Sequence, residues 1–110
     1  MDGMKRGDLV TIALQGDYGK PRPAVVIQSD YFAEHPSVTI LPVTGELRQA
    51  PLFRIEVKPT VENSLKKRSQ IMVDKVQTVP SEKVGEVFGR LDEATMQEIN
   101  RALAVWLGFA

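Results

Sequence analysis

The chain has 110 residues, 43% hydrophobic and 25% charged, a composition typical of a single globular domain over residues 1–110 and not of a disordered chain. It contains no cysteine and one histidine, His35, which excludes disulfides and thiolate metal sites and makes a zinc site a poor match. His35 lies in a predicted surface turn, where a lone histidine is expected to be structural or idle. We therefore expect no metal and no cofactor.

The 14 Lys/Arg residues balance the 14 Asp/Glu residues, which argues against a protein that coats nucleic acid with its whole surface. A nucleic-acid site is then expected only as a local patch, with Lys20 and Arg22 or the run Lys66-Lys67-Arg68 as candidates. The alternative for this run is an ordinary solvated loop. No apolar run reaches the roughly 18 residues of a membrane helix, and the N-terminus does not resemble a signal peptide, which predicts a soluble cytoplasmic protein.

Short β-type segments separated by turn residues fill the first two thirds of the chain. Alternating and β-branched patterns predict strands over residues 9–14, 24–27, 37–43, 52–57 and 69–79, the last of them long or bent. The continuous apolar run 24–27 is typical of a strand that is covered on both sides. Residues 80–83 suggest one helical turn, and residues 84–91 a last short strand.

The periodicity changes at Asp92, which is a good N-cap for a helix that ends at Gly108. An apolar stripe at spacings of 3, 4 and 3 residues predicts that one face of this helix, its tryptophan included, packs in the core: Met96, Ile99, Leu103 and Trp106. Five or six short strands plus a terminal helix predict a mainly β fold (α+β), with the sheet curved into a small, partly open barrel.

Arg22 is the side chain with the clearest potential for chemistry. It lies between two prolines, which restrict the backbone and so aim the side chain with little entropy to lose. A guanidinium stays protonated, so it can clamp a phosphate and neutralise charge that develops during phosphoryl transfer. Thr44, at the end of a predicted strand, can donate a hydroxyl to the same phosphate. In the alternative, Arg22 pairs with Glu46 or Asp74, and Thr44 only caps a turn.

Four segments, taken together in order and spacing, resemble the MazF/PemK family of toxin–antitoxin ribonucleases. They are residues 6–10, 19–27, 39–44 and 73–79. The second segment has the pattern Gly-x-x-Arg-Pro followed by hydrophobic residues and is the most specific of the four. Residues 102–108 also resemble the closing helix of that family, so the resemblance covers nearly the whole chain.

The resemblance implies an SH3-like barrel, of the type that CcdB and PemK share, which forms a homodimer with single-stranded RNA crossing the interface. It implies a metal-independent, sequence-specific endoribonuclease that inhibits translation and growth. In this chemistry the ribose 2′-hydroxyl attacks the adjacent phosphorus and leaves a 2′,3′-cyclic phosphate and a 5′-hydroxyl. A cognate antitoxin protein with a disordered acidic tail is the implied partner, and the toxin–antitoxin complex is expected to bind DNA.

The family's catalytic positions fall on Arg22, which is expected to stabilise charge on the phosphate, and on Thr44, which is expected to hydrogen-bond it. Asp74 matches an acidic position that some members use in catalysis, although a role in orienting Arg22 or a loop is the preferred interpretation. Tyr18 is a candidate for stacking on a base; in the alternative it is a half-buried anchor of its loop. The expected RNA-binding residues are Asp17, Tyr18, Lys20, Lys66, Lys67 and Arg68.

The chain also departs from the family pattern. The loop before the Arg-Pro signature carries Asp17 and Tyr18 where many members have a Glu-Gln pair, and it has no histidine, which some members place there. Met72 stands two positions before Asp74, where some relatives carry an arginine. The exact acid–base roles and the recognised base sequence are therefore not carried over from the family.

Two other functions stay open from the sequence. A gyrase poison of the CcdB type shares the barrel and has a Trp-Gly-Ile-like tail, to which residues 106–110 are superficially similar. The Arg-Pro signature and the place of Trp106 in the apolar stripe favour the nuclease. A non-catalytic barrel that binds protein or RNA is the third alternative.

Overall fold

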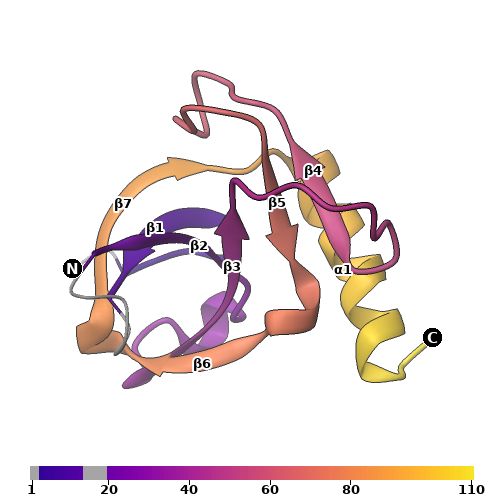
Figure 1. The fold of residues 1–110 in the computed structure, drawn as a ribbon. Coiled ribbons are helices and arrows are strands. Elements are labelled where there is room, and N and C mark those ends of the chain that lie inside the picture. The colour runs from indigo at the N-terminus through magenta and orange to yellow at the C-terminus, as the bar shows by residue number, and fades with distance from the viewer. Residues whose placement is uncertain (1–2, 14–19) are drawn as a thin grey trace.

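The computed structural model describes residues 3–13 and 20–110 of the chain. This part consists of strands β1 (Asp8–Ile12), β2 (Arg22–Val26), β3 (Ser37–Thr44), β4 (Arg54–Val57), β5 (Ser69–Met72), β6 (Gln77–Pro80) and β7 (Val84–Arg90), followed by helix α1 (Glu93–Leu107) (Figure 1). Short 3₁₀ turns occupy Asp30–Phe32, Val73–Lys75 and Ser81–Lys83. In the described part, no helix combines the length and apolar character that crossing a membrane requires.

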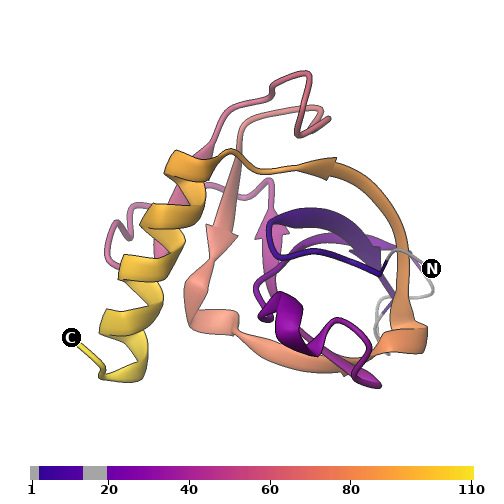
Figure 2. The ribbon, with the colours of Figure 1, turned by 180° about the vertical axis from the view of Figure 1, so that it is seen from behind.

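The strands form one antiparallel sheet in the order β4-β5-β3-β2-β1-β7. β3 pairs with β2 along one edge and divides its other edge, with residues 43–44 against β5 and residues 37–40 against β6. The sheet curls around an interior, while α1 lies outside it beside β4 (Figures 1 and 2). The mainly β class with a C-terminal helix is confirmed; the sheet stays open because β4 and β7, at its two ends, are not paired in the described structure.

The expectation of one long or bent strand over residues 69–79 is wrong. The 3₁₀ turn Val73–Lys75 divides it into β5 and β6. Val73 is fully buried, so the turn places an apolar anchor in the core and lets the two short strands pair with different halves of β3. The helical turn predicted at 80–83 is confirmed by Ser81–Lys83.

Strands β1, β2 and β3 are buried on both faces, as the continuous apolar run at 24–27 predicted. Leu9 and Val25 belong to a core cluster that α1 helps to cover, whereas the neighbouring Val10 and Ala24 belong to a second cluster on the opposite face. Alternation along each strand sends successive side chains to opposite faces, so each strand contributes to both clusters. The three strands therefore form the rigid centre of the molecule.

Helix α1 begins after Asp92 and ends at Gly108, whose φ of 85° is the left-handed conformation that glycine adopts readily. Met96 and Ile99 are buried, as expected. The expectation that Trp106 is a core residue is wrong, because its side chain is 49% exposed. The last turn of α1 extends beyond the strands on which the helix packs (Figure 1). The ring of Trp106 lies against that of Phe53, a partly buried residue next to the core, with 5.9 Å between ring centroids.

The connection between β4 and β5, residues 58–68, is a folded loop that is fixed to β7. Asn63 is 3% exposed, and its Oδ1 accepts hydrogen bonds from the backbone N–H groups of Thr60 and Leu65, each at 2.9 Å. The backbone N–H of Arg90 donates to the carbonyl of Glu62 at 2.9 Å. These contacts hold the loop in one position relative to the sheet.

Gly89→Ala is expected to destabilise the protein by about 1–3 kcal/mol, because a Cβ at this position would lie 2.3 Å from the backbone oxygen of Asn63. A side chain can rotate away from a clash, but a backbone atom cannot, so either β7 or the loop has to move. Urea unfolding followed by fluorescence measures the loss. Gly3→Ala is the control, since its nearest contact would lie at 3.5 Å; equal stability of the two variants would contradict the prediction.

Candidate active site

A cavity of about 730 Å³ opens where the ends of β2 and β3 meet the connection that leads to β5. Arg22, Thr44, Lys66 and Lys67 all line this cavity. These residues come from three separate parts of the chain, and each of them is a site residue predicted from the sequence. The fold therefore brings together four of the predicted site residues.

Arg22 is the first residue of β2 and is paired in register with Ile12 of β1. Its side chain is exposed, while the next three residues of the strand are progressively buried. Pro21 and Pro23 line the same cavity. The guanidinium thus emerges from the rim of a rigid sheet, and its backbone has little freedom to move away from the cavity.

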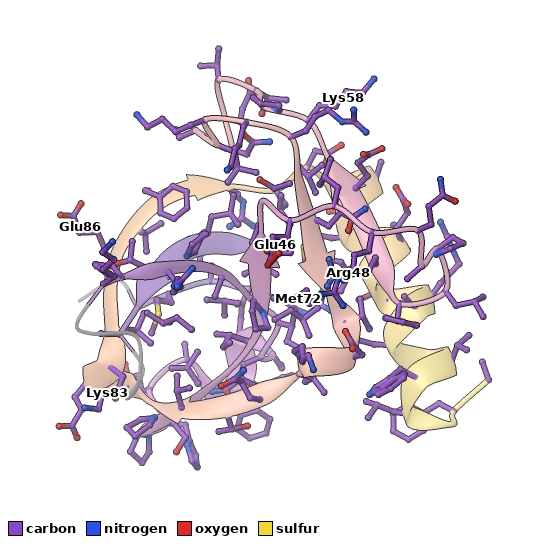
Figure 3. The ribbon with its side chains drawn as sticks, viewed as in Figure 1. Glu46, Arg48, Lys58, Met72, Lys83 and Glu86 are labelled. Carbon is purple, nitrogen blue, oxygen red and sulfur yellow. The ribbon has the colours of Figure 1, made fainter. Side chains whose placement is uncertain are left out.

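Thr44 is the last residue of β3, and its Oγ1 accepts a hydrogen bond of 3.1 Å from the backbone N–H of Glu46. Figure 3 shows Glu46 just beyond the end of β3. The alternative in which Thr44 caps a turn is therefore confirmed. It does not exclude the phosphate role, because a hydroxyl that accepts one hydrogen bond still has its own proton to donate.

The basic run 66–68 is divided between two surfaces. Lys66 and Lys67 face the cavity, whereas Arg68 forms a salt bridge with Glu56 and lines a neighbouring hollow of about 390 Å³ together with Arg48 and Arg54. Arg68 is thus not brought to the side chains of Arg22 and Thr44. The run is exposed, as a solvated loop would be, but two of its three charges are directed to the candidate site.

Two further predicted residues that the structure describes, Lys20 and Asp74, do not line the cavity. Lys20 is exposed and precedes the lining residue Pro21. Asp17 and Tyr18 lie outside the described residues. Asp74 lies in the turn Val73–Lys75, and its Oδ1 is buried without a hydrogen-bond partner in the described part of the chain. Asp74 is not among the residues that line the cavity, so its catalytic role stays a prediction.

One wall of the cavity is apolar and was not predicted from the sequence. Leu65, Met72 and Phe88 are half-buried side chains that line it together with Ile12. They come from β1, β5, β7 and the 58–68 connection, and only the curvature of the sheet makes them neighbours. No local sequence signal marks such a wall, because each residue alone is an ordinary strand or loop residue.

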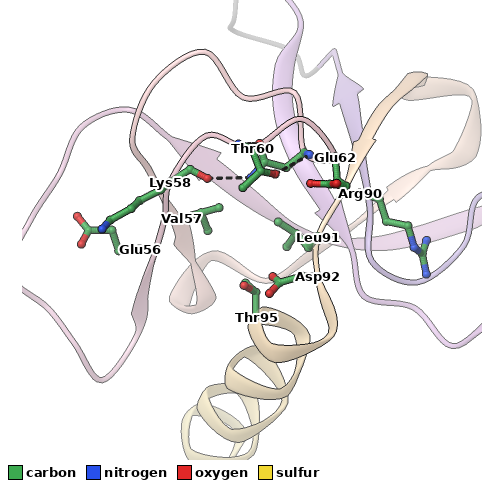
Figure 4. Close-up of a pocket in the computed structure, with 10 residues that line it drawn as sticks. Glu56, Val57, Lys58, Thr60, Glu62, Arg90, Leu91, Asp92 and Thr95 are labelled. Carbon is green, nitrogen blue, oxygen red and sulfur yellow. Dashed lines mark hydrogen bonds between the residues drawn. The ribbon is translucent and has the colours of Figure 1, made fainter.

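A second cavity of about 600 Å³ lies on another face, between the 58–68 connection and the start of α1 (Figure 4). Its lining carries charges of both signs, including Lys58, Glu62, Arg90 and Asp92. Of the predicted site residues that the structure describes, none lines this second cavity. Within residues 3–13 and 20–110, no group of three His, Asp or Glu side chains is arranged to hold a metal ion.

The first cavity is suited to a phosphodiester with an attached base. Three cationic side chains and a hydroxyl lie at its rim, and an apolar wall adjoins them. Guanidinium and ammonium groups bind phosphate oxygens, and apolar or aromatic surfaces accept the faces of unstacked bases. We therefore take this cavity as the candidate active site.

Residues 5–107 match the family described as PemK-like, MazF-like toxin of type II toxin–antitoxin system. The chain belongs to this family. It is 46% identical, over 97% of its own length and 99% of the relative's, to the probable endoribonuclease MazF of Mycolicibacterium smegmatis. It is 30% identical, over 96% of its length and 92% of the relative's, to the endoribonuclease MazF of Staphylococcus saprophyticus.

Solved structures of MazF-like proteins share the fold. An endoribonuclease from a mycobacterial species, solved in complex with its cognate antitoxin, superimposes with a TM-score of 0.82 at 23% identity. This superposition covers 97% of each chain. A MazE–MazF complex from Deinococcus radiodurans gives a TM-score of 0.78 at 19% identity and covers 100% of both. The mainly β architecture with a closing helix is thus the MazF-like architecture.

Proposed function

We propose that this MazF-like chain is the toxin of a toxin–antitoxin pair and acts as an endoribonuclease that cuts single-stranded RNA in the Arg22–Thr44 cavity. The observation that carries the proposal is that Arg22 and Thr44, far apart in the sequence, share one cavity with Lys66 and Lys67. Family membership and 46% identity to a probable endoribonuclease MazF support the same activity. Since no comparable signature points to a gyrase poison, the nuclease is favoured over it.

In the proposed reaction, the ribose 2′-oxygen forms a bond to the adjacent phosphorus while the bond from phosphorus to the 5′-oxygen breaks. The 2′-hydroxyl proton is lost and the 5′-oxygen gains one, which yields a 2′,3′-cyclic phosphate and a 5′-hydroxyl. The substrate supplies its own nucleophile, so the protein has to position the strand and stabilise the growing negative charge. Arg22 provides a permanent positive charge for this, and Thr44 provides a hydrogen-bond donor. We propose that the reaction needs no metal ion.

Incubation of the purified protein with a long single-stranded RNA in excess chelator tests the function. We expect discrete fragments that carry a 5′-hydroxyl and a cyclic phosphate, with cleavage concentrated at a short recurring sequence. A parallel supercoiling assay with DNA gyrase tests the alternative function, that of a gyrase poison. Intact RNA together with inhibited supercoiling would contradict the proposal and favour the gyrase poison.

We further propose that the chain works in the cytoplasm as a homodimer and is neutralised by a cognate antitoxin. A mycobacterial structural neighbour was solved with its cognate antitoxin, and the Deinococcus radiodurans neighbour with MazE, which supports an antitoxin as partner. Arg22, Lys66 and Lys67 concentrate positive charge at the cavity. An acidic segment laid over these residues would gain electrostatic attraction and would block the RNA site.

A further inference from the structure

We propose that Lys67 is a second cationic contact to the scissile phosphate and that Gly45 positions it. This inference rests on the proposed ribonuclease function and adds two roles to it. The ammonium group of Lys67 binds phosphate beside Thr44, and Gly45, because it has no side chain, leaves room for this ammonium group. The class of ligand is an RNA phosphodiester.

The contact between position 45 and Lys67 carries the inference. Gly45 directly follows Thr44 at the end of β3. A Cβ on residue 45 would lie 2.4 Å from Cε of Lys67 and 2.7 Å from its Nζ. The end of the lysine side chain therefore occupies the space above Gly45, and its ammonium group lies next to the residue that carries the proposed hydroxyl donor.

Conformation does not require glycine at position 45. Of the described glycines only Gly7 and Gly108 have a positive φ, so the backbone of residue 45 suits any L-amino acid. The absence of a side chain at position 45 thus has a different effect: it leaves the space that the side chain of Lys67 occupies. A larger residue would displace the ammonium group without straining the backbone.

Lys67 is better placed for this role than its two basic neighbours. Arg68 is held by Glu56, and Lys66 lines the cavity but is not the residue that packs over Gly45. Within the described residues, the ammonium group of Lys67 has no salt-bridge partner, so its charge is available to an anion. A cation fixed beside a hydroxyl donor adds to the stabilisation of charge on one phosphate group.

The backbone that carries Lys67 is also fixed before any ligand binds. Asn63 anchors the preceding loop, and the hydroxyl of Ser69 donates a hydrogen bond of 3.0 Å to the carbonyl of Lys67. Ser64 adopts a φ of 56°, an unusual conformation for a residue with a side chain, which the anchored loop maintains. A preorganised cation loses less entropy on binding than one on a free loop.

The test compares Gly45→Ala, Lys67→Met and the double variant in steady-state RNA cleavage, with the wild-type protein and Arg22→Ala measured alongside. We expect each single variant to lower kcat/KM by about tenfold to a hundredfold, the range for loss of one hydrogen bond to a charged group. The double variant should be no worse than Lys67→Met, because both changes remove the same contact. Gly45→Ala should unfold at the wild-type urea concentration.

Three further measurements separate a direct contact from a general effect. Lys67→Met should reduce the slope of log kcat/KM against log salt by about 0.7, the value for one lost contact to a single-stranded phosphate. Lys67→Arg should retain most of the activity, because the positive charge remains. Lys58→Met is the matched control: this lysine lies in the same connection but lines the other cavity (Figure 4), and its loss should leave cleavage unchanged.

Wild-type activity in Gly45→Ala would overturn the positioning role, and so would a double variant whose defect is the product of the two single defects. Wild-type activity in Lys67→Met would overturn the phosphate contact. In each of these cases, the proposed function would still be supported if the wild-type protein cuts RNA and Arg22→Ala does not. If the wild-type protein cuts no RNA, the proposed function and this inference fail together.

Discussion

Arg22→Ala is expected to lower kcat/KM for RNA cleavage by at least about a thousandfold, the lower end of the range for arginines that stabilise transferring phosphoryl groups. The side chain is exposed at the rim of β2 and lines the cavity that contains Thr44. Its removal would take away a permanent charge where we propose that negative charge grows, and among the described residues that line the cavity there is no other arginine to act as a bidentate donor. Cleavage rates over a range of RNA concentrations measure the effect.

Two variants serve as controls for Arg22. Arg22→Lys keeps the charge but loses the planar pair of donors, so its activity should fall between that of the wild type and that of the alanine variant. Arg101→Ala removes an exposed arginine on α1, away from the cavity, and should cut RNA at the wild-type rate. A loss in Arg22→Ala that is matched by Arg101→Ala would reveal a general charge effect instead of a role in the site.

Thr44→Val is expected to lower kcat by about 100- to 1,000-fold, the usual cost of removing one donor to a developing oxyanion. Valine keeps the shape of threonine and its β-branched preference for a strand, so β3 should remain intact. Quenched-flow measurement of the cleavage step separates this loss from weaker RNA binding.

Thr44→Ser restores the hydroxyl and should recover most of the rate. The hydroxyl also accepts the backbone N–H of Glu46, so Thr44→Val could loosen the turn that follows β3. Thr39→Val, at the other end of the same strand, removes a hydroxyl that is hydrogen-bonded to that of Thr78 and lies away from the cavity. If Thr44→Ser is as inactive as Thr44→Val, the hydroxyl is not the donor.

The fold class could be predicted from the sequence because its signals are local. Short β-branched segments, one amphipathic helix and a terminal glycine each report the conformation of their own residues. The break between β5 and β6 could not be predicted in this way. The break arises because β5 and β6 both pair with the same edge of β3, and this pairing is a property of the whole sheet. The exposure of Trp106 was missed because periodicity shows which face of a helix is apolar, not where the surface beneath it ends.

The candidate site was predicted in part. Arg22 and Thr44 were recognised because each has a distinctive setting, between prolines and at a strand end, and because the family signature covers both. The apolar wall of Met72 and Phe88 and the packing of Lys67 over Gly45 depend on contacts between segments far apart in the sequence. The sequence shows which residues could act, whereas the folded chain shows which of them line the same cavity.

The strand that ends in Thr44 is also the one that β2, β5 and β6 all pair with. Local opening of such a strand would break pairings on both of its edges and expose Leu41, which is fully buried. Exchange of its amide hydrogens should therefore require global unfolding. We therefore expect an inhibitor directed at the proposed site to act by covering the Arg22–Thr44 cavity, and not by unfolding β3, the strand beneath it.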